Sequence, residues 1–456
     1  MMLDPLAAGP SHSTMPSHST HLTRRHFLKS TAVAAAAAGV PLWFLEREQA
    51  LAATVPKPPG ANDRPGFALV GCGGMGSGNA NDFLNKGADL VAVCDVDQGH
   101  VDVAVKKFSQ GGKTPVRFTD FRKLLERDDV HAIINGTPDH WHTLINLAAC
   151  RAGKDIYTEK PLTLTIDEGK RLVKTVRDTG RVVQVGSWQR SDRPFRVACE
   201  LVLNGRIGKV QHVEVGLPTG PREGPFPKLP VPAGLNWDWY LGQAPVMDYN
   251  GRNCHGNFRW WYPFSGGQIT DWGAHHFDIA QWGLGMDASG PVEVQGKSFV
   301  EMIPGGYQTA SQYELNYRYA NGVTMRAADE KRLPNGVKFI GSDGWIFVAR
   351  GNKLDASKDD LVQTPLPSDA KRLYNSRDHR INLIECMRSR KDPVCPVEVG
   401  NRSINIAHIG VISLRMGGAK LQWDPAKGEF TGTDAAAANQ WLSREMRAPY
   451  DYTFIG

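Results

Sequence analysis

Short apolar runs alternate with helix-like stretches in the chain between about residues 66 and 187. The runs, each four or five residues long, cover residues 66–70, 90–94, 131–135, 155–158 and 181–185. The first of them leads into a helix-like stretch over about residues 77–86. Continuous apolar strands separated by helices are typical of a parallel sheet that is covered on both faces. The pattern therefore predicts an α/β domain with a doubly wound parallel sheet.

After about residue 190 the pattern changes, and apolar residues alternate with polar ones. The alternating segments cover residues 210–215, 292–300, 314–319, 323–326, 337–340 and 345–348. Two pairs of these segments flank Asn321-Gly322 and Asp343-Gly344, and both dipeptides are strong signals for β-hairpins. We therefore predict a second α/β domain with an open, mainly antiparallel sheet.

Three further segments complete this second domain. Helical patterns near residues 379–390 and 401–417 are expected to pack back on the body of the protein. Residues 216–236 are rich in proline and glycine. Such a long excursion fits a lid, a loop used in oligomer contacts or a passive surface loop, and the sequence leaves these three open.

The N-terminal segment has the parts of an export signal in the usual order. Residues 23–29, TRRHFLK, resemble the bacterial twin-arginine signal, and an alanine-rich apolar run follows to about Leu45. Ala50-Leu51-Ala52 then offers an A-x-A cleavage site. The alternative is an amphipathic leader that stays in the cytoplasm. The apolar run is too short to span a bilayer comfortably, so we do not expect an integral membrane protein after cleavage.

These patterns divide the chain into four parts. We predict a polar extension and signal peptide over residues 1–53, a linker over 54–65, a dinucleotide-binding domain over 66–187 and a substrate-binding and oligomerisation domain over 188–456.

Composition narrows the functional classes. The 456 residues have a net charge of +6, but no long Lys/Arg run occurs, so nucleic-acid binding is not expected. The seven cysteines are scattered without CxxC spacing. This argues against a disulfide framework and a zinc site, while it leaves room for one incidental bridge.

A glycine-rich loop follows the first predicted strand. Gly71, Gly73, Gly74, Met75 and Gly76 belong to the segment GCGGMG, which fits G-x-G-x-x-G. Such glycines let the backbone approach a pyrophosphate at the start of a helix. The alternative is a tight strand–helix turn without a ligand.

An acidic residue follows at the expected distance. Asp95 ends the second strand 19 residues after Gly76, where a carboxylate can bind a ribose hydroxyl. A carboxylate there repels a 2′-phosphate, so we predict NAD as the cofactor, with NADP still possible if a nearby cation compensates.

Reactive side chains occur at later strand ends and on one helix. Thr137, Glu159 and Lys160 follow apolar strands, where ligands of such sheets bind. Residues 265–278 are predicted to form a helix that places Asp271 and His275 one turn apart on one face. Lys160 can polarise a substrate oxygen, His275 can take its proton, and Asp271 can orient His275 or bind a second hydroxyl. Each could instead be structural.

A metal site is the alternative for the same helix. Asp271, His275, His276 and Asp278 are all ligand types. Because two of the four point away on a helix and no cysteine joins them, we expect no catalytic metal.

Together these segments resemble the Gfo/Idh/MocA family, whose name combines glucose–fructose oxidoreductase, inositol dehydrogenase and a rhizopine enzyme. The resemblance runs from about Phe67 to the C-terminus. It rests on four segments: GCGGMG, TPDHWH at 137–142, AGKDIYTEKPL at 152–162 and GGxxxDxxxHxxD at 266–278. It implies a Rossmann domain, a second domain with an open antiparallel sheet, and homodimers or tetramers joined sheet to sheet.

The resemblance also implies roles for individual residues. The catalytic set would be Lys160, Asp271 and His275. The cofactor contacts would fall on Gly71, Gly73, Gly76, Asp95, Thr137, Pro138, His142, Glu159 and Lys160. Gln189 and Arg190 would border the substrate pocket, which Asp271, His275 and His276 would also line. The segments QVGSWQRS and TDWGAHHFDIAQW look like a large exported branch of the family.

We therefore predict a periplasmic enzyme, exported by the twin-arginine machinery, that moves a hydride between tightly bound NAD and a sugar or polyol. The alternative is an NAD-dependent, redox-neutral glycosidase or lyase that acts through a transient keto-sugar. The family includes such glycosidases, although their Thr-His-Gly segment is not found here. A third hypothesis is a non-enzymatic sensor or binding protein, against which the complete set of Lys160, Asp271 and His275 argues.

Overall fold

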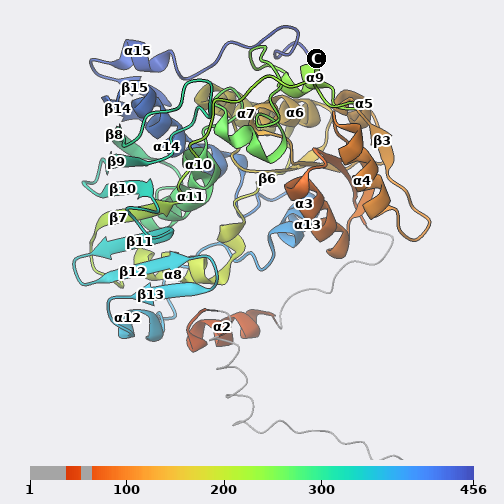
Figure 1. Ribbon diagram of the computed structural model, residues 1–456. Helices are drawn as coiled ribbons and strands as arrows, with labels where there is room; N and C mark the ends of the chain where they lie inside the picture. The colour runs from red at the N-terminus through yellow and green to blue at the C-terminus, as the bar shows by residue number, and fades with distance from the viewer. Residues whose placement is uncertain (1–36, 38, 53–63) are drawn as a thin grey trace, which may run out of the picture.

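The computed structural model describes residues 37, 39–52 and 64–456 (Figure 1). The twin-arginine motif and most of the predicted linker lie outside these residues. The described chain forms two sheets, one parallel and one mainly antiparallel, as the hydrophobic pattern predicts.

The first sheet has six strands in the order β3-β2-β1-β4-β5-β6. All its neighbouring pairs are parallel. The strands are β1 (Gly66–Val70), β2 (Asp89–Cys94), β3 (Val116–Phe118), β4 (Ala132–Asn135), β5 (Asp155–Thr158) and β6 (Val183–Val185). The edge strand β3 is largely exposed, so no apolar run marks it in the sequence.

Helices cover both faces of this sheet. They are α3 (Gly74–Asn85), α4 (Gln98–Phe108), α5 (Phe121–Leu125), α6 (Asp139–Arg151) and α7 (Ile166–Thr179). Phe67 and Leu69 of β1 pack in one core with α3 and α4, whereas Ala68 and Val70 pack in the other with α5, α6 and α7. Because successive residues of a strand point to opposite faces, the continuous apolar run of β1 supplies both cores.

The second sheet has nine strands in the order β13-β12-β11-β7-β10-β9-β8-β14-β15. Only β7 and β10 pair in parallel; the other pairs are antiparallel. The strands are β7 (Val210–Leu217), β8 (Pro291–Ser298), β9 (Tyr313–Tyr319), β10 (Thr324–Asp329), β11 (Gly336–Gly341), β12 (Trp345–Ala349), β13 (Lys353–Ala356), β14 (Lys420–Asp424) and β15 (Glu429–Thr431). Both predicted hairpins, β9–β10 and β11–β12, are present.

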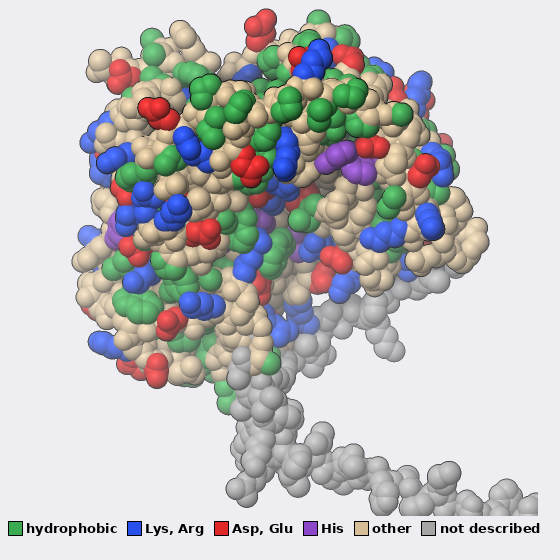
Figure 2. All heavy atoms as spheres, in the orientation of Figure 1, with side chains coloured by type: hydrophobic (Ala, Val, Ile, Leu, Met, Phe, Trp, Pro, Cys, Tyr) green, Lys and Arg blue, Asp and Glu red, His purple; other side chains and the backbone are tan. Residues whose placement is uncertain are grey.

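Three long helices lie against one face of the second sheet (Figure 1): α8 (Arg193–Leu203), α11 (Gly273–Leu284) and α14 (Val397–Arg415). The other predicted helix is α13 (His379–Ser389), which packs with α3 of the first domain. Residues 218–232 contain neither helix nor strand, and their role as a lid or oligomer loop stays a prediction. Basic and acidic side chains are interspersed over the face in Figure 2.

An unexpected feature is that part of the leader is docked on the body. Helix α2 (Leu42–Ala52) lies beside β13 and α12 (Asp360–Gln363) (Figure 1). Phe44 is fully buried in the main core, and the Trp43 indole donates to the Val362 carbonyl at 3.1 Å. Glu48 and Arg196 form an ion pair of 2.7 Å with only 4% and 3% of their side chains exposed. Cleavage after Ala52 would remove this helix and leave Arg196 without Glu48.

Replacing Glu48 with alanine in the full chain is expected to lower the free energy of unfolding by about 2 kcal/mol, because a buried guanidinium loses a charged hydrogen-bond partner. Urea denaturation measures the change. Glu46→Ala is the matched control, since Glu46 is exposed on the same helix. Equal stability of the two variants would mean that α2 is undocked in solution.

Candidate active site

The loop between β1 and α3 has the shape that a dinucleotide needs. Gly71 adopts a left-handed φ of 88°, and a Cβ there would lie 2.6 Å from the Gly136 carbonyl carbon. A Cβ on Gly136 would lie 2.6 Å from the Cα of Gly76, so these two strand ends require glycine. At Gly73 and Gly74 a side chain would meet no described atom within 4 Å. The backbone thus faces open space at a helix N-terminus, which fits a pyrophosphate.

A cavity of about 390 Å³ runs along this loop. Seven of the predicted cofactor residues line it: Gly71, Gly73, Gly74, Met75, Asp95, Thr137 and Pro138. Its other wall comes from the second domain and includes Trp239, Tyr240, His255, Phe258 and Arg259. The aromatic-rich segments at residues 237–240 and 258–264 stand out in the sequence as a source of one or two rings for the site, and the structure brings rings from both of them to this wall.

Hydrogen bonds hold this second wall in place. The His140 ring bonds the Tyr240 carbonyl at 2.9 Å, and the Trp141 indole donates to the Trp239 carbonyl at 3.0 Å. The Asn236 amide donates to the Val96 carbonyl at 2.9 Å. The cavity therefore lies between the two domains.

Asp95 lies at the end of β2 in this cavity. Its carboxylate accepts the Cys72 amide at 2.7 Å and the Asp97 amide at 3.0 Å. The His100 ring lies 3.5 Å away, and its hydrogen bond with Asp95 raises the pKa of His100. Asp95 is thus fixed where a ribose hydroxyl is expected.

Replacing Asp95 with alanine is expected to relax discrimination against NADP, because the charge that repels a 2′-phosphate is lost. Competitive loading of the unfolded and refolded protein with NAD and NADP measures the preference. Asp102→Ala, an exposed carboxylate on α4, is the control. If Asp95→Ala prefers NAD over NADP as strongly as the wild type does, Asp95 does not determine the choice of cofactor.

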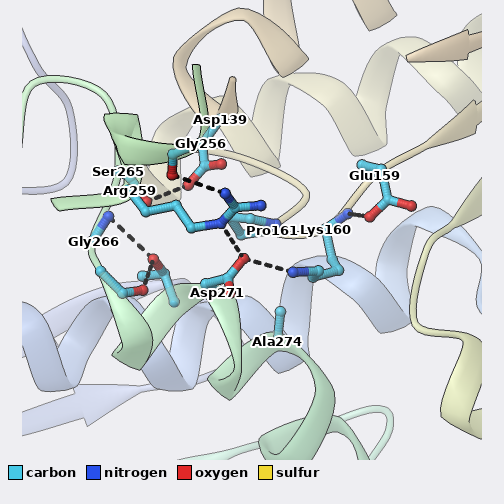
Figure 3. A network of polar contacts seen from close by, with 12 residues as sticks. Asp139, Glu159, Lys160, Pro161, Gly256, Arg259, Ser265, Gly266, Asp271 and Ala274 are labelled. Carbon is cyan, nitrogen blue, oxygen red and sulfur yellow. Dashed lines mark hydrogen bonds and ion pairs between the residues drawn. The ribbon is translucent and has the colours of Figure 1, made fainter. Parts of the chain in front are cut away.

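The predicted catalytic residues Lys160 and Asp271 meet at the carboxyl end of the parallel sheet. The Lys160 ammonium lies 2.6 Å from Asp271 Oδ1, and both side chains are about nine-tenths buried (Figure 3). Arg259 places its Nε 3.2 Å from the same oxygen. Burial opposes the charge of Asp271, but the two cations prevail and lower the pKa of that carboxyl. Asp271 is therefore an anion held between two cations.

The helix that carries Asp271 differs from the prediction. It is divided at Trp272 into α10 (Gln268–Asp271) and α11, which carries His275. The Asp271 carboxylate bonds Lys160 and Arg259. Both of these contacts use Oδ1 of Asp271, and the orientation of His275 by Asp271 stays a prediction.

His275 is buried beside this ion pair. Desolvation, with the charge of Lys160 next, lowers the pKa of His275 well below its usual value. The imidazole is therefore neutral at neutral pH. Its Nδ1 has no hydrogen-bond partner among the described residues. A neutral ring with a free nitrogen can accept a proton from a substrate hydroxyl.

Two residues predicted to contact the cofactor form hydrogen bonds to the loops around the cavity. Both His142 nitrogens bond backbone oxygens, those of Pro161 at 2.7 Å and Thr137 at 2.9 Å. Glu159 accepts the Asn79 amide of α3 at 2.7 Å. Neither side chain lines the 390 Å³ cavity, and a cofactor contact of either residue stays a prediction.

The residues predicted to border the substrate have different surroundings. Arg190 is 2% exposed and pairs with Asp278 at 2.8 Å and Asp287 at 2.7 Å, so its guanidinium is bound inside the second domain and the prediction is corrected. His276 bonds the Gly216 carbonyl at 2.9 Å through Nδ1. Gln189 is fully buried, and neither its amide nitrogen nor its oxygen has a partner in the described chain. A substrate contact of Gln189 or His276 stays a prediction.

The four residues of the alternative metal site do not converge. Asp271 is held by Lys160 and Arg259, and Asp278 binds Arg190 and the Ser403 hydroxyl. All seven cysteines are free thiols.

Asp139 is a further buried group beside the ion pair that the sequence did not indicate (Figure 3). It accepts the Ser265 hydroxyl at 2.6 Å, and desolvation raises the pKa of its carboxyl to about 7. Arg259 was likewise missed, since an arginine within an aromatic-rich segment carries no signal for catalysis.

With this geometry established, comparison with known proteins identifies the family. Residues 66–187 match the model of the oxidoreductase family's NAD-binding Rossmann fold, and residues 222–452 match that of its C-terminal alpha/beta domain. The chain belongs to the Gfo/Idh/MocA family. It thus has an NAD-binding domain of an oxidoreductase family, as the sequence predicts, and NAD is its cofactor. Residues 21–41 match the twin-arginine translocation signal, which indicates export.

Relatives within the family have different activities. The scyllo-inositol 2-dehydrogenase (NAD(+)) of Bacillus subtilis is 24% identical over 72% of this chain and 87% of its own length. A glycosyl hydrolase family 109 protein of Shewanella pealeana is 30% identical over 42% of this chain. The match spans 45% of that protein, less than half of its length.

Solved structures share the fold. GenD2 from gentamicin A biosynthesis, in complex with NAD, has a TM-score of 0.60 at 18% identity and covers 81% of this chain and 99% of its own. Levoglucosan dehydrogenase, in complex with NADH and L-sorbose, has a TM-score of 0.59 at 17% identity and covers 79% and 98%. Among the described helices, none is long and apolar enough to cross a membrane.

Proposed function

We propose that this protein is a periplasmic oxidoreductase that moves a hydride between tightly held NAD and a hydroxyl or ketone of a sugar or polyol. The observation that carries the proposal is the neutral His275 beside the Lys160–Asp271 pair, at the carboxyl end of an NAD-binding sheet. Such an arrangement offers a proton acceptor and a cation next to the place where a carbinol would lie.

The residues divide the chemistry as follows. When bound, NAD supplies the acceptor or donor of the hydride. Lys160 donates a hydrogen bond to the reacting oxygen and stabilises negative charge that develops on it. His275 takes the hydroxyl proton at its free nitrogen as the C–H hydride leaves, and returns it in the reverse reaction. Asp271 keeps the Lys160 ammonium in position.

Retention of the cofactor follows from the proposed location. A periplasmic enzyme has no soluble pool of NAD, so oxidation of one sugar has to be balanced by reduction of another, or of the same one. The position of the cavity between the two domains, with residues of both in its lining, supports this proposal. NAD loaded in the cytoplasm can travel inside a protein that is exported folded.

A redox-neutral glycosidase or lyase is the second candidate. The similarity to glycosyl hydrolase family 109 proteins, confined to less than half of their length, favours it. In this reaction His275 and Lys160 would assist oxidation of a sugar hydroxyl to a transient ketone, with the hydride passed to NAD. Elimination of the aglycone and addition of water would follow, and return of the hydride to the ketone would make the net reaction redox-neutral.

The test uses purified protein without added cofactor. Denaturation should release about one NAD or NADH per chain, and incubation with sugar pairs should interconvert them. Release of an aglycone from glycosides would support the second candidate instead. A protein that contains no nicotinamide, takes up none on refolding and turns over neither class of substrate would refute both and favour a binding protein. A homodimer or homotetramer is also proposed, and sedimentation measures it.

A further inference from the structure

A cluster of metal-ligand side chains lies at the mouth of the cofactor cavity, outside the catalytic residues. Asp97 and His100 come from the corner between β2 and α4, and His255 comes from η3 (His255–Trp260) of the second domain. Each offers one ligand atom, and the three atoms lie within 4.8 Å of one another. Figure 2 shows histidine next to acidic side chains on the face near α4.

The spacing is close to that of a tetrahedral site. Ligand atoms about 2.0–2.1 Å from a zinc ion lie about 3.4 Å from one another. His255 Nε2 and Asp97 Oδ2 are already 3.3 Å apart. All three ligand atoms lie within 4.8 Å of one another, so a contraction of at most about 1.4 Å would bring them to the spacing of a zinc site.

The ligand atoms that these three side chains leave available also fit a cation. Asp97 uses Oδ1 to cap α4 at the Gly99 amide, which leaves Oδ2 directed at His255. His100 lies beside the Asp95 carboxylate, and a carboxylate at a ring nitrogen commonly orients a metal-bound imidazole. His255 is exposed, so a fourth position is open to water. His255 also has a left-handed φ of 49°, a conformation that a non-glycine residue keeps only where its surroundings impose it.

We propose that Asp97, His100 and His255 bind a divalent cation, Zn²⁺ in preference to Mg²⁺ or Ca²⁺, and thereby link the two domains across the cofactor cavity. Two imidazoles and one carboxylate favour zinc, whereas the other two ions prefer oxygen ligands alone. The proposal of a cation site depends only on the geometry of these three residues. A cation that links the two domains should also slow the exchange of NAD, and this consequence rests on the proposed function.

Binding is tested on the purified full chain after treatment with a chelator and its removal. Zn²⁺ alone should bind at one per chain in calorimetry, and X-ray absorption should show two imidazole ligands. His255→Asn should weaken Zn²⁺ binding by at least about 10-fold, because even the loss of a residue that only hydrogen-bonds a metal ligand lowers metal affinity by that much. His212→Asn is the matched control, since His212 lies on β7 away from the cluster and should leave binding unchanged.

Each outcome decides the proposal. Equal Zn²⁺ binding by wild type and by both His100→Asn and His255→Asn, or no binding by a folded wild-type protein, would overturn it and leave Asp97–His255 as a simple ion pair. Circular dichroism and NAD content are measured on every variant. A folded protein that holds NAD but binds no zinc refutes this site while the proposed function stands. A folded protein that binds zinc but holds no NAD supports the site and contradicts the proposed function.

Discussion

Lys160→Ala is expected to lower kcat by ~10²–10⁴-fold while the protein keeps its bound NAD. The ammonium lies 2.6 Å from Asp271, and its charge is the one that lowers the pKa of His275 most. In the proposed function its loss removes the donor to the reacting oxygen. It does not line the cofactor cavity, and the glycine loop and Asp95 that hold NAD are unchanged.

The measurement is single-turnover reduction of the bound NAD by excess substrate, followed by NADH absorbance. Lys170→Ala is the matched control, because Lys170 forms an exposed ion pair with Asp167 on α7. Removal of the lysine also leaves Asp271 with Arg259 alone, so thermal unfolding of Lys160→Ala is compared with that of Lys160→Met, which retains the apolar stem. Full turnover by a folded Lys160→Ala protein would show that the catalytic set is wrongly assigned.

His275→Asn is expected to cause a loss of similar size, ~10²–10⁴-fold in the oxidation rate, and to change the pH profile. The pKa of His275 in the folded protein lies well below 6.5. Above that pKa the ring is neutral and can accept a proton, so the wild-type rate should stay level as the pH falls through 6.5 and decline only at lower pH. In His275→Asn this acid decline should disappear, because the titrating group is gone.

The same pKa shift predicts the direction of acid destabilisation. Below pH 6.5 the unfolded chain binds a proton at His275 before the folded chain does, so the free energy of unfolding falls as the pH decreases below that value. His275→Asn should reduce this slope, whereas His212→Asn should keep the wild-type rate and its acid decline. A His275→Asn enzyme with wild-type rate and profile would exclude His275 as the base.

The two cations on Asp271 have a further consequence for mechanism. An aspartate held by both Lys160 and Arg259 stays ionised, so it is unsuited to donate a proton near neutral pH. Asp139 close by has a carboxyl pKa of about 7 and lacks such a pair. The proposed function therefore gives the proton transfer to the neutral His275 and gives the Asp271 carboxylate the role of positioning Lys160.

Local sequence was sufficient for the type of both sheets, for most of their strands and for the glycine loop, but it did not indicate β3, β13, β14 or β15. The apolar residues of β1 pack into two cores because successive strand residues point to opposite faces. Asn321-Gly322 closes the β9–β10 hairpin because these two residues favour the backbone conformation of a tight turn. The glycines of the β1–α3 loop are required by close backbone contacts, such as that between Gly76 and Gly136. The strand run and the hairpin depend on interactions within a few residues or within one repeating pattern, whereas the glycine loop is recognised from its local motif and tightened by a contact from another part of the chain.

Only the tertiary structure decided which charges meet. The sequence spacing predicts that Asp271 and His275 lie on one helix face. In the fold the Asp271 carboxylate accepts hydrogen bonds from Lys160, which lies 111 residues away in the sequence, and from Arg259. Arg190, which the sequence places at the substrate pocket, forms a buried ion pair with Asp278. His255 lies next to Asp97 of the first domain. The partner of a side chain depends on how whole elements pack, and pairwise charge interactions leave no periodic trace in the sequence, so such contacts follow from the assembled fold alone.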